Sequence, residues 1–345
     1  MRQIRSAVFA TILAFSSAAS AFTPENGTWW NPAEPGTGFL IEIQDNFLFL
    51  AGYMYAPDGR PMWYTSQGTM NGNARFVGEL TSFSGGQCLG CIWQQPAVQL
   101  GAGGPVEIIF DTETDARITL GGRVVPIRRF DYALTRTPGD AKNELMLGEW
   151  QVTIDFSASS TVGFPFYGDV LIYQTVDRAP NPDVFDGCRA DNSLIGRCTQ
   201  NAIATHDSSG FYQASTGDHY LIVNDDPNNF AYYVVKTGTY QFDGIVKICP
   251  KNLSNVTTQC LQSNNYRAFP VRGHRTASRT FVLTGSGPNE PDKAKINSEW
   301  SLARMVGDTR INDGLDNTAV KSRFNIDLSQ APVKELEFLA DRVAR

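Results

Sequence analysis

Long apolar runs are rare in this chain of 345 residues, and basic charge is in deficit. After residue 21 no stretch is long and apolar enough to cross a bilayer as a helix, so we expect no transmembrane segment. Without residues 1–21, Lys plus Arg falls from 29 to 27 against 35 Asp plus Glu, a net charge of −8. So acidic a chain has no basic surface that could displace counterions from a polyanion. This argues against nucleic-acid partners and against nonspecific binding to anionic lipid.

Catalytic signatures are also scarce. The sequence has three histidines, His206, His219 and His274, and neither a Gly-x-Ser-x-Gly nor a His-Glu-x-x-His motif. The run His206-Asp207-Ser208 has the residue types of a catalytic triad, but consecutive neighbours do not form triad geometry. His206 and His219 would bind a metal if a hairpin brought them together, although surface or interstrand histidines are commoner. We therefore predict no catalytic residue and no metal site.

The acidic residues gather in turns between apolar segments. None of these groups matches the twelve-residue calcium loop, because in "DTETDARITLGG" Ala116 replaces the required glycine and the closing glutamate is absent. Calcium thus has no motif, and we expect no cofactor. Two acids at the right separation would serve a hydrolase, but solvated turns are the simpler interpretation. The groups are Asp111, Glu113 and Asp115; Asp183, Asp186 and Asp191; Asp225 and Asp226; and Asp313 and Asp316.

The first residues have the pattern of a secretory signal peptide. Arg2 and Arg5 precede the apolar run "SAVFATILAF", and Ala19-Ser20-Ala21 is a small-residue cleavage site. No cysteine follows that site, so lipid anchoring there is not suggested. We expect a mature chain that begins near Phe22 and is exported to the periplasm or secreted.

Six cysteines in an exported chain predict structural disulfides. Pairing between nearest neighbours is the simplest of the 15 connectivities, and it gives Cys88–Cys91, Cys188–Cys198 and Cys249–Cys260. The "CLGC" spacing also occurs in redox and zinc sites. However, a redox site needs a helix N-terminus, and a zinc site needs further ligands nearby. We expect Cys88 and Cys91 to close a glycine-rich loop instead.

Alternating apolar and polar residues predict β-strands along both halves of the chain. Phe39, Ile41 and Ile43 face one way in the first half, and Asn71-Gly72 is one of several hairpin signals. Near the end, Val333 and Leu336 begin an apolar helical face that continues through Leu339 and Val343. The fold class is therefore all-β, with two antiparallel β domains (barrel- or sandwich-like meanders) and a short C-terminal helix.

The polar segment "TRTPGDAKNE" marks the expected boundary between the two domains. The predicted divisions are a signal peptide at 1–21, an N-terminal β-meander domain at 22–135, a linker at 136–144, a C-terminal β-rich domain at 145–330 and a helix at 331–345.

A tryptophan doublet lies close to the expected mature start. Adjacent side chains on a strand face opposite ways, so if Trp29 enters the core, Trp30 lies on the other face. Trp63 recurs after a turn, near Tyr53 and Tyr55, and an exposed aromatic cluster of this kind can bind sugar rings or peptides. The alternative is that both rings of the doublet pack under the loop at 32–35, because large aromatic side chains are mostly buried.

The segment from "GTWWNPAEPGTGF" to "YMYAPDGRPMWY" resembles a module of exported bacterial proteins of unassigned function. The similarity covers residues 26–68, continues weakly to about residue 130 and does not reach the C-terminal half; Pro35 departs from the usual small polar residue. The resemblance implies export and an all-β domain, and it carries over no catalytic residue. The matching positions are Trp29, Trp30, Asn31, Pro32, Gly36, Gly38, Tyr53, Tyr55, Asp58, Gly59, Pro61 and Trp63.

The favoured function is a non-catalytic binding module for a cell-envelope or extracellular polysaccharide or peptide. Its ligand-binding residues would be Trp30, Tyr53, Tyr55 and Trp63. One alternative is a hydrolase that acts on an envelope polymer through loop residues of the second domain. Another is a structural component of a surface or an assembly.

Overall fold

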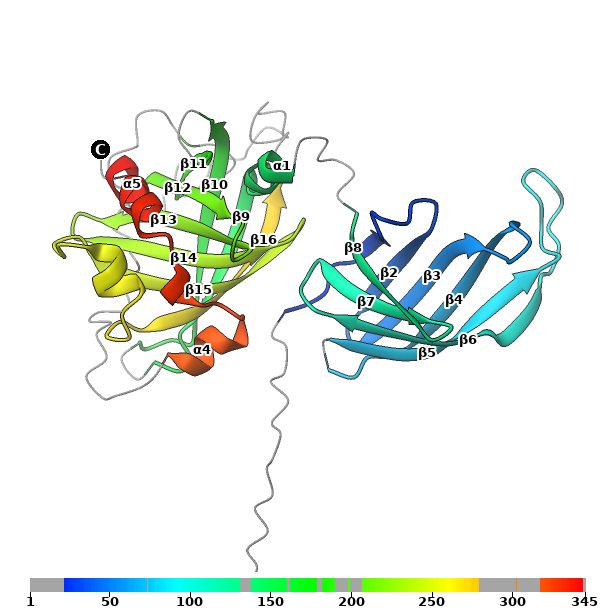
Figure 1. Cartoon of the computed structure of the whole chain (residues 1–345). Coiled ribbons are helices and arrows are strands. Elements are labelled where there is room, and N and C mark those ends of the chain that lie inside the picture. The colour runs from blue at the N-terminus through cyan, green and yellow to red at the C-terminus, as the bar shows by residue number, and fades with distance from the viewer. Residues whose placement is uncertain are drawn as a thin grey trace, which may run out of the picture.

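Two closed antiparallel β-barrels of eight strands each make up most of the molecule (Figure 1). The computed structural model describes residues 22–72, 74–130, 138–159, 162–178, 182–189, 198, 207–278, 302 and 317–343. The expected signal peptide lies outside the described residues, as do parts of the second-domain loops. The predicted all-β class, with two antiparallel β domains and a C-terminal helix, is confirmed.

The first barrel is an up-and-down meander in which each strand pairs with the next one along the chain. It closes where Trp29 of the first strand pairs with Arg129 of the last. Tight turns link most neighbouring strands, and Gly59 adopts a φ of 83° in one of them, a value that favours glycine. The strands are β1 (Gly27–Trp30), β2 (Gly38–Gln44), β3 (Phe47–Tyr55), β4 (Pro61–Thr69), β5 (Arg75–Ser84), β6 (Ala97–Phe110), β7 (Asp115–Leu120) and β8 (Arg123–Arg129).

The second barrel repeats this topology and closes between its first and last strands. One short helix precedes it, a helical turn lies between β15 and β16, and the other described helical segments follow it in the chain. Its strands are β9 (Gly148–Asp155), β10 (Phe166–Asp177), β11 (Val184–Arg189), β12 (Asp207–Gln213), β13 (Asp218–Asp226), β14 (Asn229–Thr237), β15 (Gln241–Pro250) and β16 (Ala268–Ala277). The helical segments are α1 (Pro138–Leu145), η1 (Thr257–Leu261), α4 (Thr318–Arg323), η2 (Leu328–Gln330) and α5 (Val333–Val343).

The second barrel is apolar on both faces of strands β13 to β15. Inward residues such as Leu221 and Tyr233 fill the barrel, while the outward residues Tyr220 and Ile222 form a separate cluster with the C-terminal segment. Helix α5 lies against this outer face and contacts β12 and β13 (Figure 1). The chain therefore covers the apolar exterior of its own second barrel, which explains why these strands show no alternation of apolar and polar residues.

The predicted C-terminal helix is present, with Leu336, Leu339 and Val343 buried as its helical spacing requires. The predicted linker differs, because α1 occupies most of it. Pro138 suits the first position of a helix, where no backbone N–H bond is lost. Asn143 then fixes the helix to the second barrel by accepting a hydrogen bond from the backbone N–H of Tyr212, at 2.9 Å.

All three predicted disulfides are formed: Cys88–Cys91, Cys188–Cys198 and Cys249–Cys260. None of the helices that the structure describes is both long and apolar enough to span a membrane.

Candidate functional site

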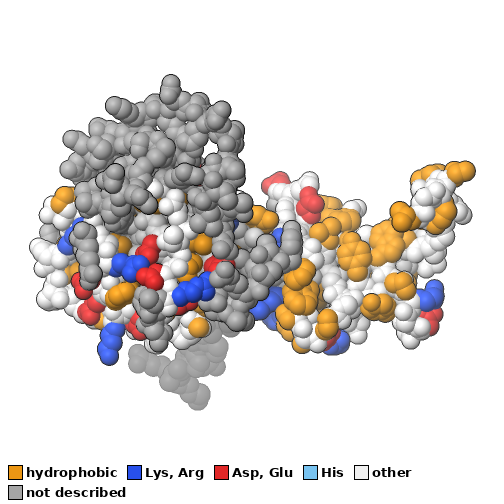
Figure 2. Space-filling model, turned by 90° about the horizontal axis from the view of Figure 1, so that it is seen from above, with side chains coloured by type: hydrophobic (Ala, Val, Ile, Leu, Met, Phe, Trp, Pro, Cys, Tyr) orange, Lys and Arg blue, Asp and Glu red, His pale blue; other side chains and the backbone are white. Residues whose placement is uncertain are grey.

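The outer surface of the first barrel carries a group of exposed aromatic side chains. Along β3 the side chains alternate, so that Leu48 and Leu50 fill the barrel while Phe49, Tyr53 and Tyr55 face outward. Figure 2 shows hydrophobic side chains gathered over this barrel. The inward half of the pattern forms the core, and the outward half leaves an apolar surface open to solvent.

The strand register places several of these side chains in one row across the barrel, which we call the aromatic row. Tyr53 on β3 pairs with Trp63 on β4, and Phe83 on β5 pairs with Val98 on β6. The register between β4 and β5 then sets Phe83 opposite Trp63. Neighbouring strands lie roughly 5 Å apart, so the row is a continuous apolar band.

Trp63 and Phe83 stack face to face in this row. Their ring centroids are 4.4 Å apart and their planes differ by 8°. Each ring therefore closes one face of the other. A ligand can reach at most one face of each ring here.

The tryptophan doublet divides between core and surface. Trp29 is fully buried, packs edge-on against Phe110 and donates a hydrogen bond from Nε1 to the backbone oxygen of Glu25, at 3.1 Å. Trp30 faces the other way, half-buried, with its ring 4.9 Å from that of Phe130. The register of β1 with β2, carried one residue further, places Trp30 opposite Gly38, and Gly38 pairs with Tyr53. Trp30 therefore extends the aromatic row beyond Tyr53.

All four residues proposed as ligand-binding from the sequence thus lie on one surface. Tyr53, Tyr55 and Trp63 are exposed, and Trp30 is half-buried at the end of the row. Phe83 was missed, because nothing in its local pattern shows that it stacks on Trp63. Strands β3 and β4 contain no charged residue, whereas at the end of the row Arg128 of β8 lies opposite Trp30.

The loop between β5 and β6 was also missed as a candidate site. Leu89, Ile92 and Trp93 are exposed on it, beside the Cys88–Cys91 disulfide. We call residues 85–96 the apolar loop. A signal was available in the sequence, because the chain carries no charged residue from Leu80 to Val106.

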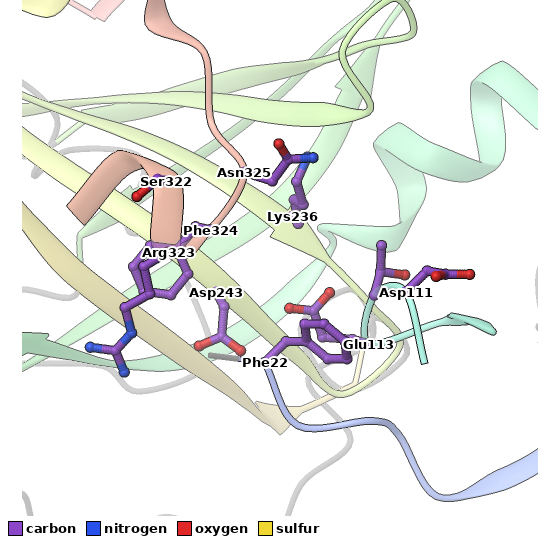
Figure 3. Close-up of a pocket in the computed structure, with 10 residues that line it drawn as sticks. Phe22, Asp111, Glu113, Lys236, Asp243, Ser322, Arg323, Phe324 and Asn325 are labelled. Atoms are coloured by element: carbon purple, nitrogen blue, oxygen red, sulfur yellow. The ribbon is translucent and has the colours of Figure 1, made fainter. Parts of the chain in front are cut away.

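A cavity of about 220 Å³ lies where the two barrels meet (Figure 3). The first barrel contributes the turn after β6 and the segment before β1, and the second contributes β14, β15 and the end of α4. Its lining residues are Phe22, Asp111, Thr112, Glu113, Lys236, Asp243, Ser322, Arg323, Phe324 and Asn325.

Two carboxyl groups from different barrels meet in this cavity. Glu113 and Asp243 are both buried and hydrogen-bond to each other. Burial, reinforced by the charge of Asp243, raises the pKa of Glu113 to about 8. Burial also raises the pKa of Asp243, against the opposing hydrogen bond from Arg272. At neutral pH the protonated Glu113 carboxyl can therefore donate to the Asp243 carboxylate.

The segment before β1 ties the barrels together beside this pair. The backbone N–H of Glu25 donates to the backbone oxygen of Glu113 at 2.9 Å, and its Oε1 accepts from the backbone N–H of Tyr240 at 2.6 Å. Gln241 donates from its side chain to the backbone oxygen of Thr23. Residues 23 and 25 thus join the first barrel to the turn between β14 and β15.

Most other described acids that the sequence singled out have basic partners. Asp111 pairs with Arg117 and Asp115 with Arg128, both at the surface. In the second barrel Asp186 pairs with Arg342. Asp225 and Asp169 both contact the buried Arg189, the latter at 2.9 Å. Asp191, Asp313 and Asp316 lie outside the described residues.

No group of three or more metal-ligating side chains occurs within the described part of the chain. His219 is buried in the second barrel, and its Nε2 lies 2.8 Å from the backbone oxygen of Lys142. Burial lowers the pKa of His219 to about 3, so the ring stays neutral. His206 lies outside the described residues.

In comparisons with known proteins, no family model, curated protein or solved structure matches the chain. The resemblance to exported bacterial modules therefore stays a prediction.

Proposed function

We propose that this chain is an exported, non-catalytic binding protein, and that the outer surface of its first barrel binds an apolar polypeptide segment of the cell envelope or its surroundings. The observation that carries the proposal is the aromatic row, in which Tyr53, Trp63 and Phe83 lie side by side on the barrel exterior. Trp30 and Tyr55 flank the row.

The contrast between the barrels supports a binding role for this surface. Contiguous apolar surface is costly to leave in water, and on soluble proteins large patches mark interaction sites. On the second barrel, α5 covers the corresponding apolar exterior with Leu336 and Leu339. The exterior around Tyr53 and Trp63 stays exposed within the described chain. A partner that buried it would gain the stabilisation that α5 gives the second barrel.

The chemistry of the surface favours an apolar polypeptide over a charged ligand or a sugar chain. Strands β3 and β4 offer no charge to attract an ionic ligand. Sugar rings bind best on open aromatic faces, whereas Trp63 and Phe83 close one face of each other. Gly38 lies between Trp30 and Tyr53 and lacks a side chain. That gap spans two strand spacings, about 10 Å, and accommodates an apolar side chain from a partner.

The test is intrinsic tryptophan fluorescence of the mature protein, titrated with a proline-rich decapeptide, a leucine-rich decapeptide and a neutral soluble glucan. We expect saturable binding of a peptide that weakens at least tenfold in Trp63→Ala and in Tyr53→Ala. Val124→Ala is the matched control, because Val124 is an exposed apolar residue on β8 of the same barrel. Binding of the glucan alone would overturn the polypeptide assignment, and equal binding by all variants would overturn the site.

The carboxyl pair at the barrel junction favours one second candidate, a hydrolase of an envelope polymer. Two neighbouring acids can divide the roles of acid and base when the pKa of one of them is raised to near neutrality. Glu113, kept protonated at neutral pH, would be the acid and Asp243 the base. Hydrolysis of labelled envelope glycans that Glu113→Gln and Asp243→Asn abolish, and that Trp63→Ala leaves intact, would support this candidate over the first.

A further inference from the structure

The apolar loop, residues 85–96, projects from the first barrel at the end remote from the second (Figure 1). Relative to a fully accessible side chain, the exposed fractions are 105% for Leu89, 94% for Ile92 and 68% for Trp93. Figure 2 shows hydrophobic side chains at this projecting tip. Three large apolar residues with so little cover are unusual on a chain that buries most others of their kind.

Charge is missing from the loop and from the strands that carry it. The run from Leu80 to Val106 holds 27 residues, none of them acidic or basic, and Glu79 and Glu107 bound it. Entry of a charged group into an apolar medium is costly, whereas this segment has no charge to desolvate. The whole projecting part of the hairpin can therefore leave water without that penalty.

Bonds within the loop also hold the tip in shape before it binds a partner. The Cys88–Cys91 disulfide closes a two-residue turn, and the backbone N–H of Cys91 donates to the backbone oxygen of Cys88 at 3.0 Å. The Gln87 side chain donates to the backbone oxygen of Cys91 at 2.8 Å. These bonds satisfy three backbone groups of the tip internally and fix its shape, so ordering the tip on binding costs less entropy.

We propose that Leu89, Ile92 and Trp93 insert into the headgroup–acyl boundary of a lipid bilayer with zwitterionic headgroups. The site goes beyond the proposed function, because its residues lie on the β5–β6 loop and not in the aromatic row.

The shape and charge of the tip favour this occupant. A convex projection finds a complementary surface in any fluid bilayer, whereas a protein partner would have to offer a matching pocket. Tryptophan prefers the membrane–water interface, and aliphatic side chains prefer the acyl region below it. The acidic net charge and the lack of Lys and Arg around the tip favour neutral headgroups over anionic ones.

The experiment is sedimentation of the full mature chain with vesicles of equal parts phosphatidylcholine and phosphatidylethanolamine. We expect partitioning into the lipid pellet that is insensitive to salt and is not improved by phosphatidylglycerol. The variant Leu89→Ser/Ile92→Ser/Trp93→Ser should lose at least tenfold in partitioning. Leu100→Ser is the matched control, since Leu100 is an exposed residue of the same uncharged run on β6, and it should bind as the wild type does.

A second readout reports on Trp93 itself. Vesicles with brominated acyl chains should quench part of the tryptophan emission, and Trp93→Phe should remove that part. Trp63→Ala should still sediment with vesicles, which separates this proposal from the peptide site on the aromatic row. Wild-type protein left in the supernatant at millimolar lipid, or sedimentation unchanged in the triple variant, would overturn the proposal. So would a triple variant that loses only peptide binding.

Discussion

Trp63 stacks on Phe83 outside the first barrel, with ring centroids 4.4 Å apart, while Trp29 of the same barrel is sealed inside it. The two tryptophans should therefore respond differently to truncation. Trp29→Ala leaves a cavity and breaks the hydrogen bond to Glu25, so we expect the free energy of unfolding to fall by about 3–5 kcal/mol. Trp63→Ala removes an exposed stacking contact, worth about 1 kcal/mol.

Urea unfolding followed by far-UV circular dichroism measures both changes. A loss of similar size in the two variants would mean that Trp63 is a structural residue, and the case for a binding surface around it would weaken.

The Glu113–Asp243 pair predicts a pH-dependent junction between the barrels. The pKa of Glu113 is about 8 in the folded protein against an ordinary value of 4.5, so the folded state holds a proton that the unfolded state releases. The free energy of unfolding should fall as the pH rises from about 4.5 to about 8, by on the order of 5 kcal/mol. Glu113→Gln, which keeps a hydrogen-bond donor without the titration, should flatten this dependence.

Other charged groups near the pair also shift the pKa values of Glu113 and Asp243. Lys236 lowers the pKa of Glu113, and Glu25 raises it; Arg272 opposes the rise at Asp243. Lys236 is itself paired with Asp218, at 2.7 Å. Urea titrations at pH 5, 7 and 9 would expose the effect, with Asp111→Asn as the control because Asp111 is partly exposed and paired with Arg117. If the stability of the wild type depended on pH as little as that of Glu113→Gln, the raised pKa of Glu113 would be contradicted.

How far the sequence could predict this molecule depends on the range of the interactions. The alternation around Trp29 and Trp30 is local, so it was enough to place the two rings on opposite faces of the strand. It did not decide whether Trp30 would be exposed, and that ring is half-buried. The stacking of Trp63 on Phe83 depends on the register between β4 and β5, which no local pattern determines. Glu113 and Asp243 lie in different barrels, and in the sequence Glu113 resembled one more solvated turn residue. The helix α1 was missed because its polar residues are typical of linkers.

Gly238 lies against Glu25, so a substitution there tests how firmly the two barrels are joined. A Cβ at this position would collide with the Glu25 carboxylate, whose Oε1 accepts the hydrogen bond from Tyr240. Gly238→Ala should therefore displace Glu25 and loosen the junction without unfolding either barrel. Small-angle scattering should show a larger radius of gyration, with an unchanged circular dichroism spectrum. Gly163→Ala is the control, because a Cβ at this loop glycine would meet nothing within 4 Å. An unaltered scattering curve for Gly238→Ala would mean that the junction does not depend on Glu25.

Helix α5 offers the last prediction, because it covers an apolar exterior like the one that the first barrel leaves exposed. Leu339 lies on the buried face of the helix, whereas the neighbouring Phe338 is 42% exposed. Leu339→Ala should lower the free energy of unfolding by about 2–5 kcal/mol and increase binding of an apolar dye, since a loosened helix uncovers Tyr220 and Ile222. Phe338→Ala should change the free energy by less than about 0.5 kcal/mol. If the dye already binds the wild type, and Trp63→Ala reduces that signal while Leu339→Ala raises it, the two exteriors are the same kind of surface, one covered by the chain and one left for a partner. Dye binding that neither Trp63→Ala nor Leu339→Ala alters would show that the two exteriors are not the same kind of surface.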